Sequence, residues 1–410
     1  MSTDRVVITG VGVLAPNGIG KEKFAGALWK GASGIGYVTL FDVGELSIKT
    51  AGEVRDFDFG ALFPNATPGC PRSVQFALTA SKMALEDAEL DVSMLDPKRA
   101  GVVLGCTTNR YELQELEYRT AQGTAEVPYL FDTKDIFLPG RLAGQYGFQG
   151  PLVNVDMACS SGNQAIMCAR DLIRSGNADV VVTGGVDVPI NMLVYAAFCQ
   201  IRAMSKRDDD PTAASRPFDK QRDGFVLSEG AGLVLVESLE HAMKRGARIY
   251  AEIIGAGLTS DAHHMLIPDK SGAQMLRAMQ LALRDARLSP WDLSYINAHG
   301  TATRLNDSIE SHAIGRLLDS KPYAVPVSSV KSMIGHTLGA AGALEIITCL
   351  LSMEQAMLPP TINLEERDED CADLDYVPNV SRSRPVSICM SNSFAFGGSN
   401  TSLILRKYDG

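Results

Sequence analysis

Two strand-like runs flank one helical stretch between residues 151 and 185, and this pattern constrains the fold most strongly. Residues 151–155 and 178–185 are mainly apolar, whereas apolar side chains in 163–173 recur at helical spacing. A strand, a helix and a second strand in quick succession are typical of parallel sheets whose faces are covered by helices. The sequence therefore predicts an α/β fold.

The same alternation continues along the chain and occurs twice. Strand-like stretches are expected at 6–14, 100–106, 225–237, 251–256, 293–297, 325–329, 386–390 and 402–406. Helices are expected at 73–89, 239–245, 275–286, 308–318 and 339–353. The stretch 225–237 fits a strand pair or a bulged strand, and 107–137 fits a polar, irregular cap or interface region. We therefore predict two related halves, residues 1–250 and 251–410.

The composition is that of an ordinary globular protein. Of 410 residues, 45% are hydrophobic and 21% are charged, and no apolar run reaches the ~20 residues that span a bilayer. The eight cysteines are scattered without a C-x-x-C pair, which favours a cytoplasmic location and disfavours a structural zinc site. The net charge of −10 disfavours nucleic acid and anionic membranes as partners, so an acidic partner needs a local basic patch.

Cys159 lies where the first strand-like run breaks into small residues, directly before a predicted helix. Unpaired backbone N–H groups and the helix dipole favour a thiolate at such a position, so a reactive cysteine is one interpretation. A buried structural thiol is the other, because free cysteine is among the most buried residue types. The local sequence leaves both open.

Two histidines occupy similar positions in the second half. His299 follows the predicted strand 293–297, His336 follows 325–329, and a helical stretch comes after each. Ligands bind at the carboxyl edge of the strands in open α/β sheets. Each histidine alone is as compatible with a capping or core role as with catalysis, but the repeated position favours function.

Three other motifs carry weaker signals. Gly10-x-Gly12 suggests dinucleotide binding, but the third glycine is absent and no suitable helix begins there. Adjacent His263 and His264 suggest a metal site, yet no further ligand lies at suitable spacing, so no metal is expected. The glycine loop 392–400 fits either a hairpin with buried aromatic rings or a mobile lid over a substrate.

Taken together, these segments closely resemble the β-ketoacyl-[acyl carrier protein] synthases of the ketosynthase II type, in the thiolase-like superfamily. The resemblance covers nearly the whole chain. Its most specific marks are Ala158-Cys159-Ser160-Ser161-Gly162, His299-Gly300-Thr301-Ala302-Thr303, Lys331-Ser332-Met333-Ile334-Gly335-His336 and Phe396-Gly397-Gly398. It implies a thiolase-like fold, a duplicated five-layer αβαβα arrangement, with the nucleophile in the first half and both histidines in the second.

The resemblance also implies a role for each matched residue. Cys159 would accept an acyl group, while His299 and His336 would promote decarboxylation of a malonyl extender and stabilise the enolate. Lys331 and Glu345 would support the site electrostatically, with a structural ion pair as the alternative. The backbone N–H groups of Cys159 and Phe396 would form the oxyanion hole. The expected substrate-binding residues are Thr301, Thr303, Phe394, Phe396 and His264.

The implied reaction is a decarboxylative Claisen condensation with malonyl-acyl carrier protein, in fatty-acid or specialised polyketide synthesis. Substrates would arrive on the phosphopantetheine of acyl carrier protein, which docks on Arg202, Lys206 and Arg207, and no cofactor would be bound. We expect a homodimer, or a heterodimer with a homologous ketosynthase-like subunit. The alternatives are an acyltransferase that passes the acyl group to an alcohol or amine, and a chain-length partner subunit.

Several positions depart from the family pattern. Ala395 stands where the loop usually has glycine, which predicts restricted gating, and Leu266 replaces a common threonine. Residues 62–72 lack the basic helix that many relatives use to dock carrier protein. The segment 185–189 is closer to synthases of nodulation-factor or polyketide type, so we favour a specialised pathway.

Overall fold

Residues 5–64, 70–123, 137–319, 321 and 323–410 are described by a computed structural model. The main strands are β1 (Val6–Ala15), β5 (Ala100–Gly105), β6 (Leu152–Val155), β7 (Val180–Asp187), β8 (Gly230–Ser238), β9 (Ala251–Ser260), β10 (Tyr295–Asn297), β11 (Val327–Ser328), β14 (Ile388–Phe394) and β15 (Ser399–Lys407). Shorter strands are β2 (Gly18–Ile19), β3 (Ile35–Tyr37), β4 (Thr50–Gly52), β12 (Met357–Leu358) and β13 (Arg382–Ser383).

The main strands form two copies of one topology. The first copy has the order β6-β5-β7-β8-β1 and the second has β11-β10-β14-β15-β9, and the two meet where β1 pairs with β9. In each copy the three outer strands are parallel, whereas β8 and β15 run antiparallel to both of their neighbours. The predicted duplication is therefore confirmed.

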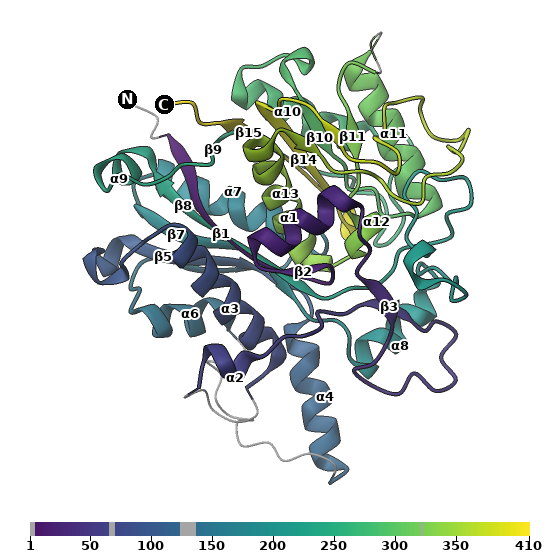
Figure 1. Cartoon of the computed structure of the whole chain (residues 1–410), viewed down its shortest axis with the longest axis horizontal. Coiled ribbons are helices and arrows are strands. Elements are labelled where there is room, and N and C mark those ends of the chain that lie inside the picture. Colours follow the sequence, from purple (N-terminus) through teal and green to yellow (C-terminus); the bar gives the residue numbers. More distant parts are fainter. Residues whose placement is uncertain (1–4, 65–69, 124–136, 320, 322) are drawn as a thin grey trace.

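Sheets and helices stack into five layers (Figure 1). The central layer is α7 (Ser161–Arg174) with α13 (Ala341–Gln355). The outer layers are α3 (Arg72–Asp87) with α6 (Leu138–Tyr146), and α10 (Ala273–Ala286) with α11 (Arg304–Leu318). Other described helices are α1 (Lys21–Lys30), α2 (Phe59–Leu62), α4 (Asn109–Ala121), α8 (Met192–Ile201), α9 (Leu239–Lys244) and α12 (Lys331–Ile334). This is the predicted αβαβα arrangement.

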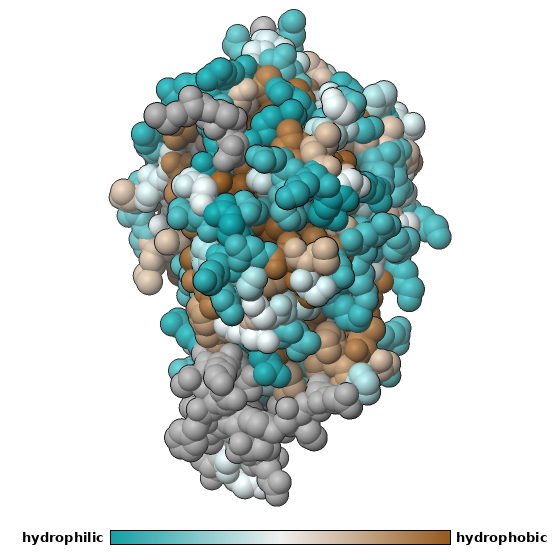
Figure 2. All heavy atoms as spheres, turned by 90° about the vertical axis from the view of Figure 1, so that its left-hand side faces the viewer, coloured by the Kyte–Doolittle hydropathy of each residue, from teal (hydrophilic) through white to brown (hydrophobic). Residues whose placement is uncertain are grey.

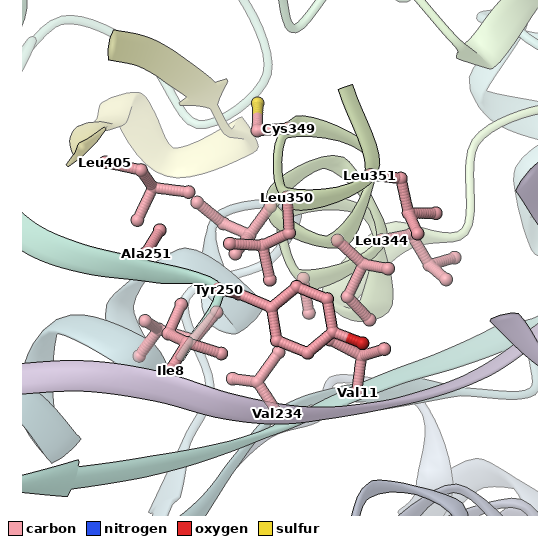
Figure 3. Close-up of a cluster of buried hydrophobic side chains, with 14 of the residues drawn as sticks. Ile8, Val11, Val234, Tyr250, Ala251, Leu344, Cys349, Leu350, Leu351 and Leu405 are labelled. Atoms are coloured by element: carbon pink, nitrogen blue, oxygen red, sulfur yellow. The ribbon is translucent and has the colours of Figure 1, made fainter. Parts of the chain in front are cut away.

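Helix α13 is mostly apolar and is buried on every side because it lies between the two copies of the strand arrangement. Its residues from Ala341 to Met353 are all buried, and Leu344 and Leu350 pack with Val11 and Val234 of the sheet (Figure 3). A helix that is hydrophobic all round belongs in a core. The outer face in Figure 2 is, by contrast, mainly hydrophilic, with hydrophobic side chains in smaller patches.

Glycine pairs let an outer helix approach the first strand of each half. A Cβ atom at Gly10 or Gly12 of β1 would lie 2.1 or 1.9 Å from a carbonyl oxygen of α3. The same holds in the second half, where Gly255 and Gly257 of β9 face α10 at 2.3 and 2.0 Å. Gly10-x-Gly12 is therefore a packing motif, repeated by the duplication, and not a nucleotide-binding turn.

The structure differs from the sequence-based prediction in two segments. Residues 109–121 form helix α4, so the prediction of an irregular region was wrong there, while 124–136 lie outside the described residues. The stretch 225–237 contains one strand, β8, preceded by isolated bridges at Phe225 and Leu227. Among the described helices, none combines the length and hydropathy that a bilayer crossing requires.

Candidate active site

The turn between β6 and α7 holds Cys159 in one position. Ala158 adopts the left-handed conformation (φ 47°), which is uncommon for a residue with a Cβ atom and is often found at functional sites. The turn is fixed by two serines: Ser160 Oγ donates to the carbonyl of Met157 at 2.8 Å, and Ser161 Oγ donates to that of Ala158 at 2.7 Å. The small polar residues around the cysteine therefore stabilise the turn.

The loop that carries His299 is shaped by carboxylates of the helix that follows it. Both oxygens of Glu310 accept backbone hydrogen bonds, from His299 at 2.7 Å and from Gly300 at 2.8 Å. Asp307 accepts the backbone N–H of Ala302 at 3.1 Å. These bonds fix the backbone at the carboxyl end of β10, where the sequence predicts a ligand site.

Lys331 connects the two histidine loops. Its Nζ donates to the backbone carbonyl of His299 at 2.6 Å, lies 3.3 Å from His299 Nδ1, and forms an ion pair with Glu345. His336 follows one turn later, and its ring meets that of His299 edge-on, with 5.4 Å between the ring centroids. Lys331 and Glu345 thus contact the histidine loops from the protein interior, whereas the histidines themselves line the cavity.

The cysteine and both histidines come together as predicted. Their potential ligand atoms, the Cys159 Sγ and one ring nitrogen each from His299 and His336, lie within 4.8 Å of one another, and all three residues are buried. A metal ion could also use such a spacing, so the expectation that the chain binds no metal stays a prediction.

Burial dominates the electrostatics of the site. It raises the pKa of the Cys159 thiol to about 11, while the Lys331 ammonium and the backbone N–H groups of Phe396 and Cys159 itself lower that pKa. Burial thus opposes the lower thiol pKa that the sequence predicts from the helix start. Burial and the Lys331 charge hold the pKa of His299 and of His336 well below the usual value, so both rings are neutral at neutral pH.

Two cavities meet at the cysteine. The first, of about 330 Å³, is lined by every predicted substrate-binding residue: Thr301, Thr303, Phe394, Phe396 and His264. The second, of about 500 Å³, lies beside α4 and α8 and is lined by Leu193, Val194, Ala197, Phe198, Ile201 and Leu338 among others. Among the described residues, only Cys159 and Phe396 line both, and Phe396 therefore lies where the two cavities join.

The glycine loop that contains Phe396 is docked on α7. Ser399 Oγ accepts from Gln164 Nε2 at 2.7 Å, and Ser393 Oγ accepts from Asn163 Nδ2 at 2.9 Å. Ala395 has φ −100° and ψ 158°, which alanine adopts freely, so it introduces no strain in this conformation. The left-handed angles fall on the two glycines that follow Phe396.

Of the three residues predicted to dock acyl carrier protein, one lies at the first cavity. Arg202 lines the first cavity, whereas Lys206 and Arg207 lie outside its lining.

Sequence reasoning missed Asp187, whose buried carboxylate accepts the backbone N–H of Thr108 at 2.8 Å and of Gly339 at 2.7 Å. The available signal was an acidic residue at the end of an apolar strand.

Comparison with known proteins agrees with this site. The family models for the beta-ketoacyl synthase N-terminal and C-terminal domains match residues 3–242 and 250–365. The chain is 42% identical to the tetracenomycin polyketide synthase ketoacyl synthase alpha subunit of Streptomyces glaucescens, over 98% of this chain and 97% of that protein. It is 41% identical to 3-oxoacyl-[acyl-carrier-protein] synthase 2 of Coxiella burnetii, over 99% of each.

Two solved structures have the same fold over full length. One is a type II polyketide synthase acyl-carrier protein in complex with its ketosynthase bound to the hexaketide, with TM-score 0.89, 34% identity and complete coverage of both chains. The other is the ishigamide ketosynthase/chain length factor, with TM-score 0.89, 36% identity and coverage of 99% and 100%. From the matched models and the full-length identities, the chain belongs to the β-ketoacyl synthase family and is a ketosynthase-type acyltransferase.

Proposed function

We propose that the chain catalyses decarboxylative Claisen condensation of an acyl group held on Cys159 with malonyl-acyl carrier protein. The observation that carries this proposal is the position of Cys159, which lies beside two neutral histidines where two cavities meet. One cavity can admit a carrier-bound thioester while the other holds the acyl chain. A bound acyl group and an incoming extender thus reach the same sulfur from different sides.

The first half-reaction is acyl transfer. With a pKa of about 11 the thiol is protonated at neutral pH, so it gives up its proton as the sulfur attacks the thioester carbonyl. The proton then passes to the departing pantetheine thiol. The backbone N–H groups of Phe396 and Cys159 hydrogen-bond at the sulfur and can donate to the tetrahedral oxyanion.

The second half-reaction forms the carbon–carbon bond. The malonyl carboxylate leaves as carbon dioxide, and the electron pair of the broken bond forms an enolate. The enolate carbon attacks the acyl carbonyl, and the Cys159 thiolate leaves and takes up one proton. His299 and His336 donate to the enolate oxygen, which neutral rings can do without protonating the carbanion, while Lys331 and Glu345 position His299.

Acyl carrier protein is the proposed partner, and its phosphopantetheine carries both substrates, so no bound cofactor is needed. Thr301 and Thr303 face the first cavity with their hydroxyls 2.9 Å apart and would contact the arm. Arg202 at the mouth, with Lys206 and Arg207 nearby in the chain, would meet the acidic carrier protein. The buried free thiols at Cys106, Cys349 and Cys389 support a reducing, cytoplasmic location.

A homodimer is the proposed assembly, with a heterodimer of homologous subunits as the alternative. Among the described strands β6 lies at one edge of the sheet and β11 at the other, and Leu152 of β6 is 39% exposed. An unpaired strand edge is a template for pairing with another chain. Leu193 of the second cavity is also exposed, at 46%, so a second subunit could complete the wall of that cavity.

Intact-protein mass spectrometry with a panel of acyl-carrier proteins tests the proposal. We expect acylation on Cys159 and, after malonyl-carrier protein is added, a product extended by two carbons. Cys159→Ala should abolish acylation, whereas His299→Ala and His336→Ala should keep it and lose extension. The matched control is His312→Ala, an exposed histidine of α11.

Each alternative function gives a different result in this assay. Acylation that is never followed by extension, but is followed by transfer to an alcohol or amine, would identify an acyltransferase. No acylation by any carrier protein would favour a chain-length subunit. Because a fatty-acid synthase and a polyketide synthase subunit are similar to nearly the same extent, the panel must contain starters of both kinds.

A further inference from the structure

Two arginines lie at the mouth of the first cavity, and one of them has no role in the function proposed so far. Arg202 follows α8 and Arg304 begins α11, and both are exposed. Both line the same cavity as Cys159, His299 and His336, which are buried. The two exposed arginines and the buried residues Cys159, His299 and His336 therefore line one cavity, with the arginines at its opening.

Neither guanidinium has a hydrogen bond or an ion pair within the described part of the chain, although the charge of Arg304 helps to lower the pKa of the Asp368 carboxyl. Arg304 offers only its backbone carbonyl, which accepts from Arg222 at 2.9 Å. The two carboxylates of the lining, Asp223 and Asp261, are already occupied, because each accepts one side-chain and one backbone hydrogen bond at 2.6 to 3.1 Å. At the opening of the cavity, the arginine side-chain N–H groups thus have no hydrogen-bond acceptor among the described residues, whereas the two aspartates already accept hydrogen bonds.

The proposed substrates carry a complementary charge. Their thioester stands at one end of the pantetheine arm, and a phosphodiester with one negative charge stands at the other. With the thioester at Cys159, the phosphate lies toward the mouth. A guanidinium matches phosphate geometry because it can donate two parallel hydrogen bonds.

We propose that Arg304, together with Arg202, binds the phosphate of the phosphopantetheine arm and so positions the thioester over Cys159. This inference rests on the function proposed above. Thr303 precedes Arg304 in the chain, lines the cavity and is hydrogen-bonded to Thr301. Polar contacts for the arm therefore continue from the threonines directly to the arginine.

The test compares two free thioesters of one acyl group, acyl-4′-phosphopantetheine and acyl-pantetheine, which differ only in the phosphate. Cys159 acylation is followed by intact-protein mass spectrometry over a range of concentrations. We expect the wild type to prefer the phosphorylated thioester by about tenfold in kcat/KM. Arg304→Met should lose this preference because it slows the reaction of acyl-4′-phosphopantetheine far more than that of acyl-pantetheine, and Arg304→Lys should keep part of it.

Arg316→Met is the matched control, since this exposed arginine lies on the same helix about 18 Å from Arg304. It should keep the full preference. Equal rates for the two thioesters in the wild type would overturn the phosphate contact and leave the proposed function standing. A loss in Arg304→Met that is confined to carrier-protein substrates would also overturn it, in favour of a contact with the protein. Failure of both thioesters and of carrier-bound substrates to acylate Cys159 would overturn the function itself.

Discussion

Lys331 Nζ donates a 2.6 Å hydrogen bond to the backbone carbonyl of His299 and lies 3.3 Å from Nδ1 of the same residue. Because an ammonium group can only donate, Nδ1 is the acceptor of this contact, and the ring proton belongs on Nε2. Glu345 is paired with the same ammonium, and burial raises the pKa of that carboxyl to about 7 although Lys331 lowers it. Lys331 thus selects the His299 tautomer that can donate into the cavity.

Lys331→Met should therefore slow condensation more than it slows acylation. Without the ammonium, His299 loses its fixed tautomer, and the pKa of that ring rises because Lys331 no longer lowers it. A lost donor or orienting group of this kind typically costs about 100-fold in kcat. The measurement is the rate of two-carbon extension from enzyme that has already been acylated.

Glu345→Gln is the control for a merely structural ion pair. Glutamine keeps an acceptor for Lys331, so extension should fall far less than in Lys331→Met. If Lys331 has only a structural role, Lys331→Met will lower the Tm, since one partner of a buried pair is left alone. Extension per folded molecule would then be unchanged, and the proposed role would be refuted.

The pH dependence of Cys159 alkylation follows from its pKa of about 11. Iodoacetamide reacts with the thiolate, whose fraction rises with pH until the pKa is reached. We expect the rate of Cys159 alkylation, followed by mass spectrometry, to rise about tenfold per pH unit between pH 7 and 10. Cys159→Ala identifies the labelled site. A plateau below pH 8 would mean that the helix start outweighs burial.

Much of the fold could be predicted because the spacing of apolar side chains reflects which face is buried. The pattern at 73–89 predicts α3, observed at Arg72–Asp87, and the small and aliphatic residues of 339–353 predict the central helix α13. The family motifs also predicted the residues around the cavity, since each motif directly follows a strand at the same edge of the fold. These features are local in the sequence.

Other features depend on segments that are distant in the chain. The pKa of Cys159 is raised by burial among residues from both halves of the chain, which the local pattern of a helix start does not indicate. Asp187 joins the backbone of Thr108 to that of Gly339, which no local pattern indicates. Arg202, directly after α8, and Arg304, the first residue of α11, are about 100 residues apart in the sequence and line one cavity only in the folded chain.

Phe396→Ala should separate the backbone role of this residue from its side-chain role. Alanine keeps the N–H group that faces the Cys159 sulfur, so acylation should continue. The ring lies where the two cavities join, and its removal opens the acyl-enzyme to water and to both cavities. We expect faster hydrolysis of acyl-Cys159, measured as loss of the acyl mass without malonyl-carrier protein. A stable acyl-enzyme would contradict a barrier role.

The two glycines after Phe396 should differ in their response to alanine. Both have left-handed angles, φ 81° at Gly397 and φ 76° at Gly398, so alanine costs about 1 kcal/mol at either position. At Gly398 the added Cβ would also lie 2.8 Å from the Cβ of Asp261, whereas at Gly397 no atom lies within 4 Å. Relief of that contact shifts the loop and with it the N–H of Phe396. Gly398→Ala should therefore lower the kcat/KM of acylation by at least about tenfold, given what a misplaced oxyanion donor costs, and Gly397→Ala should lower it much less. Equal effects in both variants, with equal loss of Tm, would show that strain alone matters and that the loop position does not.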